Sequence, residues 1–311
     1  MSQLFSVLFL RDSADAVKNP PMLTTDLIKL NNLQLAGKLV SDELSLGIQA
    51  SRRTGAGTEF EQFRHYVPGD DPKRIDWKRF AQTDQYLVRE SSTESNQQVR
   101  LLVDLSGSMN YAEAGISRLN YAKILLASIA YLSNRQADQL SLYSLQNGVV
   151  QSLIPAGKGN GPSSFQKIVA TLEMAVASGA WQNDSASVPE FGRKQTELLI
   201  IASDFLQVGN EWLNLIRSVA GPRREIIIFQ LLGDQELNFD LSGFYRFQDL
   251  ETGREVELQA EAVRDQVRER ARNYFSRLDR ALRLPHVRLI RVRLSEPIAG
   301  VLTQFLTGKQ R

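Results

Sequence analysis

The segment Asp104-Leu105-Ser106-Gly107-Ser108 carries side chains whose types and spacing suit a divalent cation. Asp104, Ser106 and Ser108 alternate, so in an extended loop their side chains can converge on one point, and Gly107 lets the backbone turn tightly between them. A carboxylate with two neutral hydroxyls is a hard oxygen set that suits Mg²⁺, Mn²⁺ or Ca²⁺ better than zinc. With so little protein charge on it, the ion keeps an open position for an incoming carboxylate. The segment therefore predicts a metal site that recognises a partner, not one that catalyses a reaction.

Three catalytic interpretations of the sequence each lack a necessary group. Asp104 as a nucleophile for phosphoryl transfer would need a second acid two residues on, where Ser106 stands. A serine-hydrolase elbow needs Gly-x-Ser-x-Gly, which residues 105–109 do not supply. The glycine-rich stretch 157–161 lacks the Lys-Ser/Thr ending of a phosphate loop. We expect no enzyme. A metal-dependent phosphoesterase that uses Asp104, and a scaffold with a degenerate metal site, are the alternatives.

Composition narrows the class of protein and of partner. The 311 residues include 37 basic and 35 acidic side chains, so net charge gives no general attraction to nucleic acid or to anionic membranes. The absence of cysteine excludes disulfides and thiolate sites, and two histidines are too few for an ordinary zinc enzyme. No apolar run approaches the ~20 residues that span a bilayer, and the apolar start lacks the basic flank of a signal peptide. We expect a cytoplasmic protein with no membrane span and no nucleic-acid partner.

An arginine-rich segment near the C-terminus is the one strong local concentration of charge. Residues 264–293 hold ten arginines, opposed by Asp265, Glu269 and Asp279. A basic stripe can contact phosphates. We interpret these arginines as the solvated face of an amphipathic helix, with contact to an acidic protein partner as the alternative.

The regular pattern after residue 97, together with one helix before it, predicts the elements that must position the Asp104 segment. Apolar, β-branched runs predict strands at 99–105, 140–145, 149–154, 197–202, 225–232 and 287–294. Helical spacing predicts helices over 24–40, 119–132, 165–176, 212–219 and 263–282. The pair Asn147-Gly148 predicts a hairpin, and Glu251-Thr252-Gly253 predicts the turn of a small hairpin insertion.

Alternation of helices with unbroken apolar strands predicts an α/β fold, with a doubly wound, mostly parallel sheet flanked by helices. Such sheets bind ligands at the carboxyl ends of their strands. Asp104, Asp204 and Asp234 each stand just past an expected strand. We therefore expect Asp204 to supply a second carboxylate from a neighbouring strand.

The spacing of Asp104, Ser106 and Ser108 resembles the Asp-x-Ser-x-Ser motif of the metal-ion-dependent adhesion site in von Willebrand factor A-type domains. The resemblance implies a Rossmann-type fold, and it matches Asp204 to the later aspartate of that site. The two serines would then coordinate Mg²⁺, or Mn²⁺ or Ca²⁺, directly, and the two aspartates largely through water. The family also uses a threonine from an intermediate loop, but residues 157–164 contain none, so Ser163 is taken as its substitute. The alternative is that Asp104, Ser108 and Asp204 only cap helices.

The segment before the sheet carries a second set of motifs. It contains Thr54-Gly55-x-Gly57-x-Glu59-Phe60, then 64–71, then Ile75-Asp76-Trp77-Lys78, then Val88-Arg89-Glu90. This order and spacing resemble the bacterial family called domain of unknown function 58, from about Leu33 to the C-terminus. The resemblance implies a von Willebrand factor A-like domain directly after these motifs. It also implies a non-catalytic adaptor that works with a MoxR-type AAA+ ATPase in chaperone-like maturation of a client protein.

The resulting domain plan has three parts. We expect a flexible arm over 1–22, an extension with the family motifs over 23–97 that packs on the main domain, and a von Willebrand factor A-like domain over 98–311. Within the extension, a docking surface for the partner would use Arg64, Asp70, Asp71, Asp76 and Trp77. The alternative is a salt-bridged structural flap, in which Trp77 and Tyr66 anchor the extension on the main sheet.

Overall fold

A computed structural model gives the fold of the chain. It describes residues 22–54, 63–66, 77, 80, 85–89, 97–156, 162–181, 196–206, 210–248, 250 and 253–307. A six-stranded sheet forms the centre of the molecule, in the order β12-β9-β8-β3-β6-β7. Within the described residues, none of the helices combines the length and the apolar character that crossing a lipid bilayer requires.

The sheet is parallel except at one edge. Its strands are β3 (Gln98–Asp104), β6 (Gln139–Gln146), β7 (Val149–Ile154), β8 (Glu197–Ser203), β9 (Arg224–Leu232) and β12 (Val287–Arg293). Only β6 and β7 pair antiparallel, around Asn147 and Gly148, whose φ angles of 51° and 76° fit a two-residue turn with positive φ at both positions. The predicted doubly wound, mostly parallel sheet is confirmed. Its strand order is that of a Rossmann-type sheet, with the switch point between β3 and β8.

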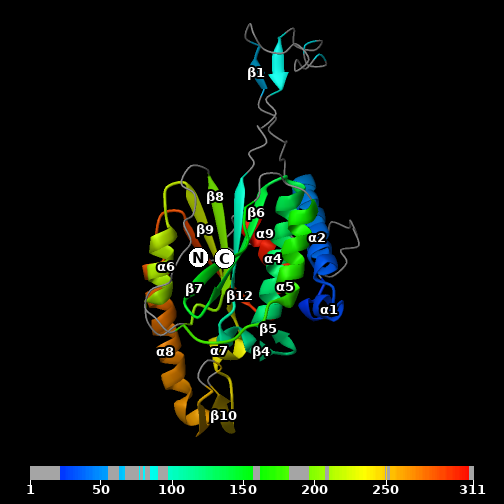
Figure 1. The fold of residues 1–311 in the computed structure, drawn as a ribbon. Helices are drawn as coiled ribbons and strands as arrows, with labels where there is room; N and C mark the ends of the chain where they lie inside the picture. Colours follow the sequence, from blue (N-terminus) through cyan, green and yellow to red (C-terminus); the bar gives the residue numbers. More distant parts are fainter. Residues whose placement is uncertain are drawn as a thin grey trace, which may run out of the picture.

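Helices cover both faces of the sheet (Figure 1). On one face lie α4 (Arg118–Arg135), α5 (Pro162–Met174) and α9 (Ile298–Thr307), and on the other lie α6 (Glu211–Val219) and α8 (Ala260–Ala281). Successive side chains of β3 point to opposite faces, so Leu101 and Val103 join the core under α4 while Leu102 joins the core under α6. This double burial explains why β3 is buried along its whole length.

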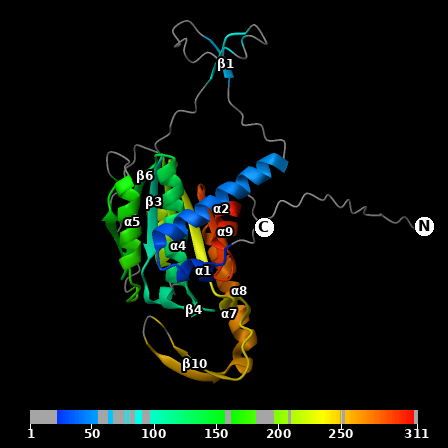
Figure 2. The same ribbon diagram turned by 90° about the vertical axis from the view of Figure 1, so that its right-hand side faces the viewer.

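The N-terminal extension packs on the domain through α4. The helix expected over 24–40 is two helices, α1 (Thr24–Lys29) and α2 (Leu33–Thr54), because Asn31 with φ 49° interrupts it. Small residues allow α2 to approach α4 closely: the Ser41 hydroxyl donates to the Ser128 carbonyl at 3.1 Å. The expected packing of the extension on the domain is thus present in α2 (Figure 2).

The rest of the extension includes a short antiparallel hairpin of β1 (Phe63–His65) and β2 (Leu87–Arg89). Figures 1 and 2 both show it away from the six-stranded sheet. Trp77 is 55% exposed and contacts Phe80 with ring centroids 6.0 Å apart. Phe80 stacks on Tyr86, which faces Tyr66. The prediction that Trp77 and Tyr66 anchor on the main sheet is therefore wrong, because these rings pack on one another.

The structure describes little of the other predicted docking residues. Arg64 lies in β1, but its side chain is outside the described residues, as are Asp70, Asp71 and Asp76. Residues 1–21 of the expected arm are also outside them.

Small elements gather at the carboxyl edge of the sheet. They are the 3-10 helix η2 (Gly107–Asn110), strands β4 (Ala112–Glu113) and β5 (Ile116–Ser117), helix α7 (Asp234–Asn238), and the hairpin of β10 (Phe244–Gln248) and β11 (Glu255–Gln259). The hairpin insertion was predicted, whereas β4, β5, α7 and α9 were not. Figure 1 shows β4, β5, α7 and β10 at the same end of the molecule.

The contact between α2 and α4 yields a test of the fold. A Cβ on Gly37 would stand 3.0 Å from the carbonyl carbon and 3.1 Å from the carbonyl oxygen of Ala127. These are backbone atoms of α4, so they can move away only if the helix itself shifts. Gly37→Ala should therefore lower the free energy of unfolding by about 1–2 kcal/mol, since overpacking outweighs the gain in helix propensity. Gly300→Ala is the control, because a Cβ there meets nothing within 4 Å. Urea denaturation measures both, and equal stability of the two variants would contradict this packing.

Candidate functional site

Two buried carboxylates stand side by side at the carboxyl edge of the sheet. Asp104 is the last residue of β3 and Asp204 directly follows β8. The two strands are parallel neighbours, with Val103 paired to Ala202. Asp104 is 1% exposed and Asp204 is 0% exposed. The predicted meeting of these two residues is present, in an environment where negative charge is costly.

Asp104 is held by donors from both sides. Its Oδ1 accepts the Ser106 backbone N–H at 2.9 Å and its Oδ2 accepts the Ser203 hydroxyl at 2.6 Å. Burial, and then the charge of Asp204, raise the pKa of Asp104 to about 7, against the lowering effect of these hydrogen bonds. The two donors therefore do not compensate the charge fully, and a nearby cation would stabilise the ionised form.

The two serines present their hydroxyls as a pair. Ser106 is buried and Ser108 half-buried, and their Oγ atoms are 3.0 Å apart. Adjacent ligands of an octahedral Mg²⁺ at about 2.0–2.1 Å from the ion are also about 3.0 Å apart. Among the described residues, no three acidic or imidazole side chains gather as a metal cage, so an ion would depend on these hydroxyls. The residues present fit a divalent cation of the Mg²⁺ type.

Helix capping does not account for these side chains. The N-cap of α4 is Ser117, whose hydroxyl accepts the Asn120 N–H at 3.1 Å. Asp204 accepts the N–H of Leu206 two residues on at 3.1 Å, as Asp104 does from Ser106. Both bonds close local turns in loops. The capping alternative is therefore wrong.

Ser163 does not complete the site. It lies in the first turn of α5, and residues that follow the other end of α5 contact the Asp104 segment. With a rise of about 1.5 Å per residue, most of the length of α5 separates Ser163 from that edge. The prediction is wrong because β7 runs antiparallel to β6, so α5 starts at the amino edge of the sheet. The side chain of Ser163 and residues 157–161 are outside the described residues.

The loop after α5 fixes the Asp104 segment instead. The Ser178 N–H donates to the Leu105 carbonyl, and the Gly107 N–H donates to the Gly179 carbonyl, both at 2.8 Å. Gly179 has φ 80°, and a Cβ there would stand 2.1 Å from Oδ1 of Asn147. The positive φ therefore favours glycine where this loop passes the β6–β7 turn, whereas the Asn147 side chain could rotate away from a Cβ.

Asp204 is held by an unusual backbone. Phe205 has φ 56°, a left-handed conformation that bulky residues rarely adopt, and its ring stacks on Trp212 with centroids 4.0 Å apart. The Tyr274 hydroxyl of α8 donates to the Phe205 carbonyl, and Gln230 Nε2 donates to the Asp204 carbonyl at 3.1 Å. Packing from α6, α8 and β9 thus holds this strained turn in place.

Arg118 is a residue of the candidate site that the sequence analysis missed. It is the first residue of α4 and is 2% exposed. Its Nη1 donates to Asp204 Oδ2 at 2.6 Å and to the Ser108 carbonyl at 2.8 Å, and its Nη2 donates to Glu236 of α7. Its guanidinium also lies over the Tyr111 ring, 4.6 Å from the centroid. We call this set of contacts the Arg118 bridge. The only sequence signal was a basic residue in the first turn of a helix, where basic residues are disfavoured.

The remaining candidates are engaged elsewhere. Asp234, the third aspartate past a strand, pairs with Arg293 at 3.3 Å. Of the C-terminal arginines, Arg291 pairs with Asp279 at 2.7 Å and Arg268 with Asp240 at 3.6 Å. These exposed pairs agree with the interpretation of a solvated face.

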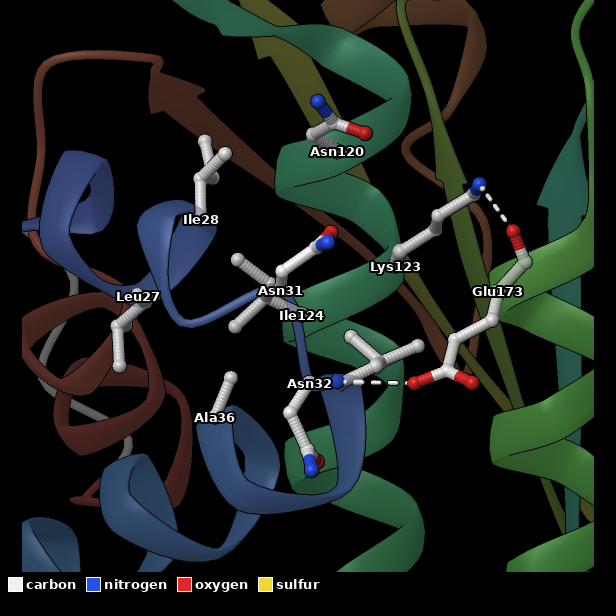
Figure 3. Close-up of a pocket in the computed structure, with 10 residues that line it drawn as sticks. Leu27, Ile28, Asn31, Asn32, Ala36, Asn120, Lys123, Ile124 and Glu173 are labelled. Atoms are coloured by element: carbon white, nitrogen blue, oxygen red, sulfur yellow. Dashed lines mark hydrogen bonds between the residues drawn. The ribbon is translucent and has the colours of Figure 1, made fainter.

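A depression of about 340 Å³ lies where α1, α2, α4 and α5 meet (Figure 3). Glu173 accepts the Leu33 N–H at 3.0 Å, and Lys123 Nζ donates to the Glu173 carbonyl at 3.2 Å. Burial lowers the pKa of Lys123. These charged groups tie three helices together, so we assign the depression a structural role.

Comparisons with known proteins give a family and distant relatives. The model of the family "Protein of unknown function DUF58" matches residues 62–277. Uncharacterized proteins of Mycobacterium tuberculosis and Mycobacterium bovis are 26% identical over 310 residues, covering 96% of this chain and 96% of each relative.

Solved structures that are similar to the chain share little sequence with it. The conserved hypothetical protein BatB from Bacteroides thetaiotaomicron is 14% identical, with a TM-score of 0.42 over 68% of this chain and 98% of that one. The SpRpn10 VWA domain is 11% identical, with a TM-score of 0.36 over 67% of this chain and 94% of that one.

The Arg118 bridge makes the stability of the domain sensitive to Asp204. Asp204→Asn should lower the free energy of unfolding by about 2 kcal/mol or more, because it removes the fully buried one of the two carboxylates that neutralise the Arg118 guanidinium, and Glu236, with a 25% exposed side chain, compensates only in part. Asp234→Asn is the matched control at the next strand end, where the pair with Arg293 is 31% and 50% exposed. The control should cost less than about 1 kcal/mol. Urea denaturation compares the two, and equal losses would contradict a buried charge pair at Asp204.

Proposed function

The chain belongs to the DUF58 family of proteins of unknown function, and we propose that it is a non-catalytic adaptor that binds a partner protein through the carboxyl edge of its sheet. The partner is a MoxR-type AAA+ ATPase, or the client protein that the two proteins mature together. The observation that carries the proposal is the pair of hydroxyls at Ser106 and Ser108, 3.0 Å apart beside two buried aspartates.

The donor set supports recognition by a divalent ion. When bound, an ion of the Mg²⁺ type supplies a position that accepts a carboxylate oxygen of the partner. Ser106 and Ser108 would hold the ion directly, and Asp104 and Asp204 would hold it largely through water. The turns at Asp104 and Asp204 orient these groups before any ligand arrives, which lowers the entropic cost of binding.

The β10–β11 hairpin lies at the same end of the molecule (Figure 1), and its exposed apolar side chains support a protein as the ligand. On the β10–β11 hairpin, Tyr245 and Phe247 share a face with Val256 and Leu258. Tyr245 is 41% and Val256 is 56% exposed, and exposed apolar side chains that share a face favour protein contact. We propose that this hairpin face adds apolar contact to the polar anchor at the sheet edge.

Burial of Asp104 argues against the phosphoesterase. Both of its carboxylate oxygens accept hydrogen bonds and the residue is 1% exposed, so neither oxygen is presented to a phosphoester. The scaffold with a degenerate metal site has one observation in its favour, because Arg118 already neutralises Asp204. It predicts intact partner binding in the absence of any metal.

Loss of the Ser108 hydroxyl tests the adaptor directly. Ser108→Ala should reduce capture of a MoxR-type ATPase from native lysate by about tenfold, because the partner's carboxylate loses its ion. The bait is the full chain with Mg²⁺ or with chelator, and mass spectrometry identifies the captured protein. Ser218→Ala is the control, since the Ser218 hydroxyl donates to the Leu215 carbonyl of its own helix, α6. Capture that neither the chelator nor Ser108→Ala changes would favour the scaffold, and turnover of a generic phosphoester lost in Asp104→Asn would favour the phosphoesterase.

A second substitution tests the hairpin surface. Val256→Asp places a charge on the exposed apolar face and should weaken capture of the same ATPase about tenfold, while the melting temperature stays unchanged. Glu257→Gln, on the opposite face of the same strand, is the control and should leave capture unchanged. Equal capture by wild type and Val256→Asp would remove the hairpin from the docking surface.

A further inference from the structure

Arg118 stands where a basic residue is electrostatically unfavourable for its own helix. It is the first residue of the 18-residue helix α4, beside the positive end of the helix dipole. It is also 2% exposed, so its charge is removed from water. Helix stability and solvation both disfavour a guanidinium here, so the carboxylates that it contacts must account for its presence.

The contacts of Arg118 join the metal loop, Asp204 and α7. Its Nη1 donates to Asp204 Oδ2 at 2.6 Å and to the Ser108 carbonyl at 2.8 Å. The guanidinium also lies over the Tyr111 ring, 4.6 Å from the ring centroid. Asp204 Oδ1 is occupied by the Leu206 N–H. Both oxygens of the second predicted metal aspartate are therefore engaged, and a positive charge lies within hydrogen-bond distance of it.

We infer that Arg118 is a built-in cation that competes with the divalent ion for Asp204 and so sets the metal affinity of the site. Two effects act in the same direction. The guanidinium occupies an oxygen that the ion or its water shell would use, and its positive charge repels a second cation in a region of low dielectric. The hydrogen-bond donors of Asp104, a backbone N–H and a hydroxyl, are both neutral. An ion beside Ser106 and Ser108 would therefore lie near one aspartate whose charge is balanced by Arg118 and one whose charge is not.

Glu236 gives the guanidinium a place to remain when an ion arrives. Its Oε1 accepts from Arg118, and its Oε2 accepts the Gly233 N–H at 2.8 Å, which fixes the carboxylate at the start of α7. Arg118 can release Asp204 without becoming an unpaired buried charge, which would otherwise prevent the exchange. Binding of the ion then replaces the Arg118 guanidinium by the divalent ion as the cation that neutralises Asp204.

This inference rests on the proposed function only in taking the divalent ion as the ligand of the site. The two can fail separately. Tight Mn²⁺ binding by an Arg118 variant, with partner capture insensitive to Ser108→Ala, would leave the inference standing and remove the adaptor mechanism.

Titration of the full chain with Mn²⁺, followed by electron paramagnetic resonance and by calorimetry, tests the competition. Arg118→Met should bind Mn²⁺ about tenfold or more tighter than wild type. Arg293→Met is the control, because it removes one positive charge, on a side chain that is 50% exposed, from an ion pair at the same edge. It should change the affinity by about twofold or less, since solvent and salt screen that charge. Circular dichroism verifies folding, and Arg118→Gln, which keeps an N–H donor toward the Ser108 carbonyl, replaces Arg118→Met if the latter does not fold.

A second measurement, a nuclear magnetic resonance titration, uses the wild-type protein. In the wild type, saturation with Mg²⁺ should shift the side-chain ¹³Cζ–¹⁵Nε resonance of Arg118, assigned by its absence from the spectrum of Arg118→Lys. The resonance of Arg100, buried against Glu197, should stay in place. An Arg118 variant that binds Mn²⁺ no tighter than wild type or Arg293→Met would overturn the inference. So would an Arg118 resonance that stays unchanged when the ion is bound.

Discussion

The pairing of β3 with β8 is the constraint on which the site depends. The two strands are parallel neighbours at the switch point of the sheet, and an aspartate ends the first and follows the second. Their carboxylates are consequently brought together in the interior, where like charges are costly. Ser203 and the Ser106 N–H hold Asp104, while Arg118 holds Asp204, and Glu236 balances Arg118. The start of α4, the position of α7 and the turn at Phe205 are parts of one arrangement that makes this pair of acids tolerable.

The fold and most of the site could be predicted because they follow from local pattern and sheet geometry. Apolar runs fixed the strands, and the carboxyl ends of parallel strands meet at one edge, which brings Asp104 and Asp204 together whatever their separation in sequence. The alternation of Asp104, Ser106 and Ser108 is likewise a local property of the chain. The positive-φ turn at Asn147 and Gly148 was equally local.

What could not be predicted depends on contacts between distant elements. Arg118 matters only because β8 and α7 bring carboxylates to the start of α4, which no spacing in the sequence reveals. Ser163 was assigned to the site by analogy of position, but the antiparallel β7 puts its helix start at the other edge. The break at Asn31 and the exposure of Trp77 were missed because periodicity and residue type do not report tertiary packing.

The site is thus a cluster of oxygen ligands for a divalent ion, beside the positive charge of Arg118, and the central claim is that an ion can bind there. A crystal structure of the full chain grown with saturating Mn²⁺, with anomalous data collected at the manganese edge, tests it most directly. The account predicts an anomalous peak between the Oγ atoms of Ser106 and Ser108, about 2.0–2.3 Å from each. A map without a peak there, in crystals of both the full chain and Arg118→Met grown with saturating Mn²⁺, would contradict it.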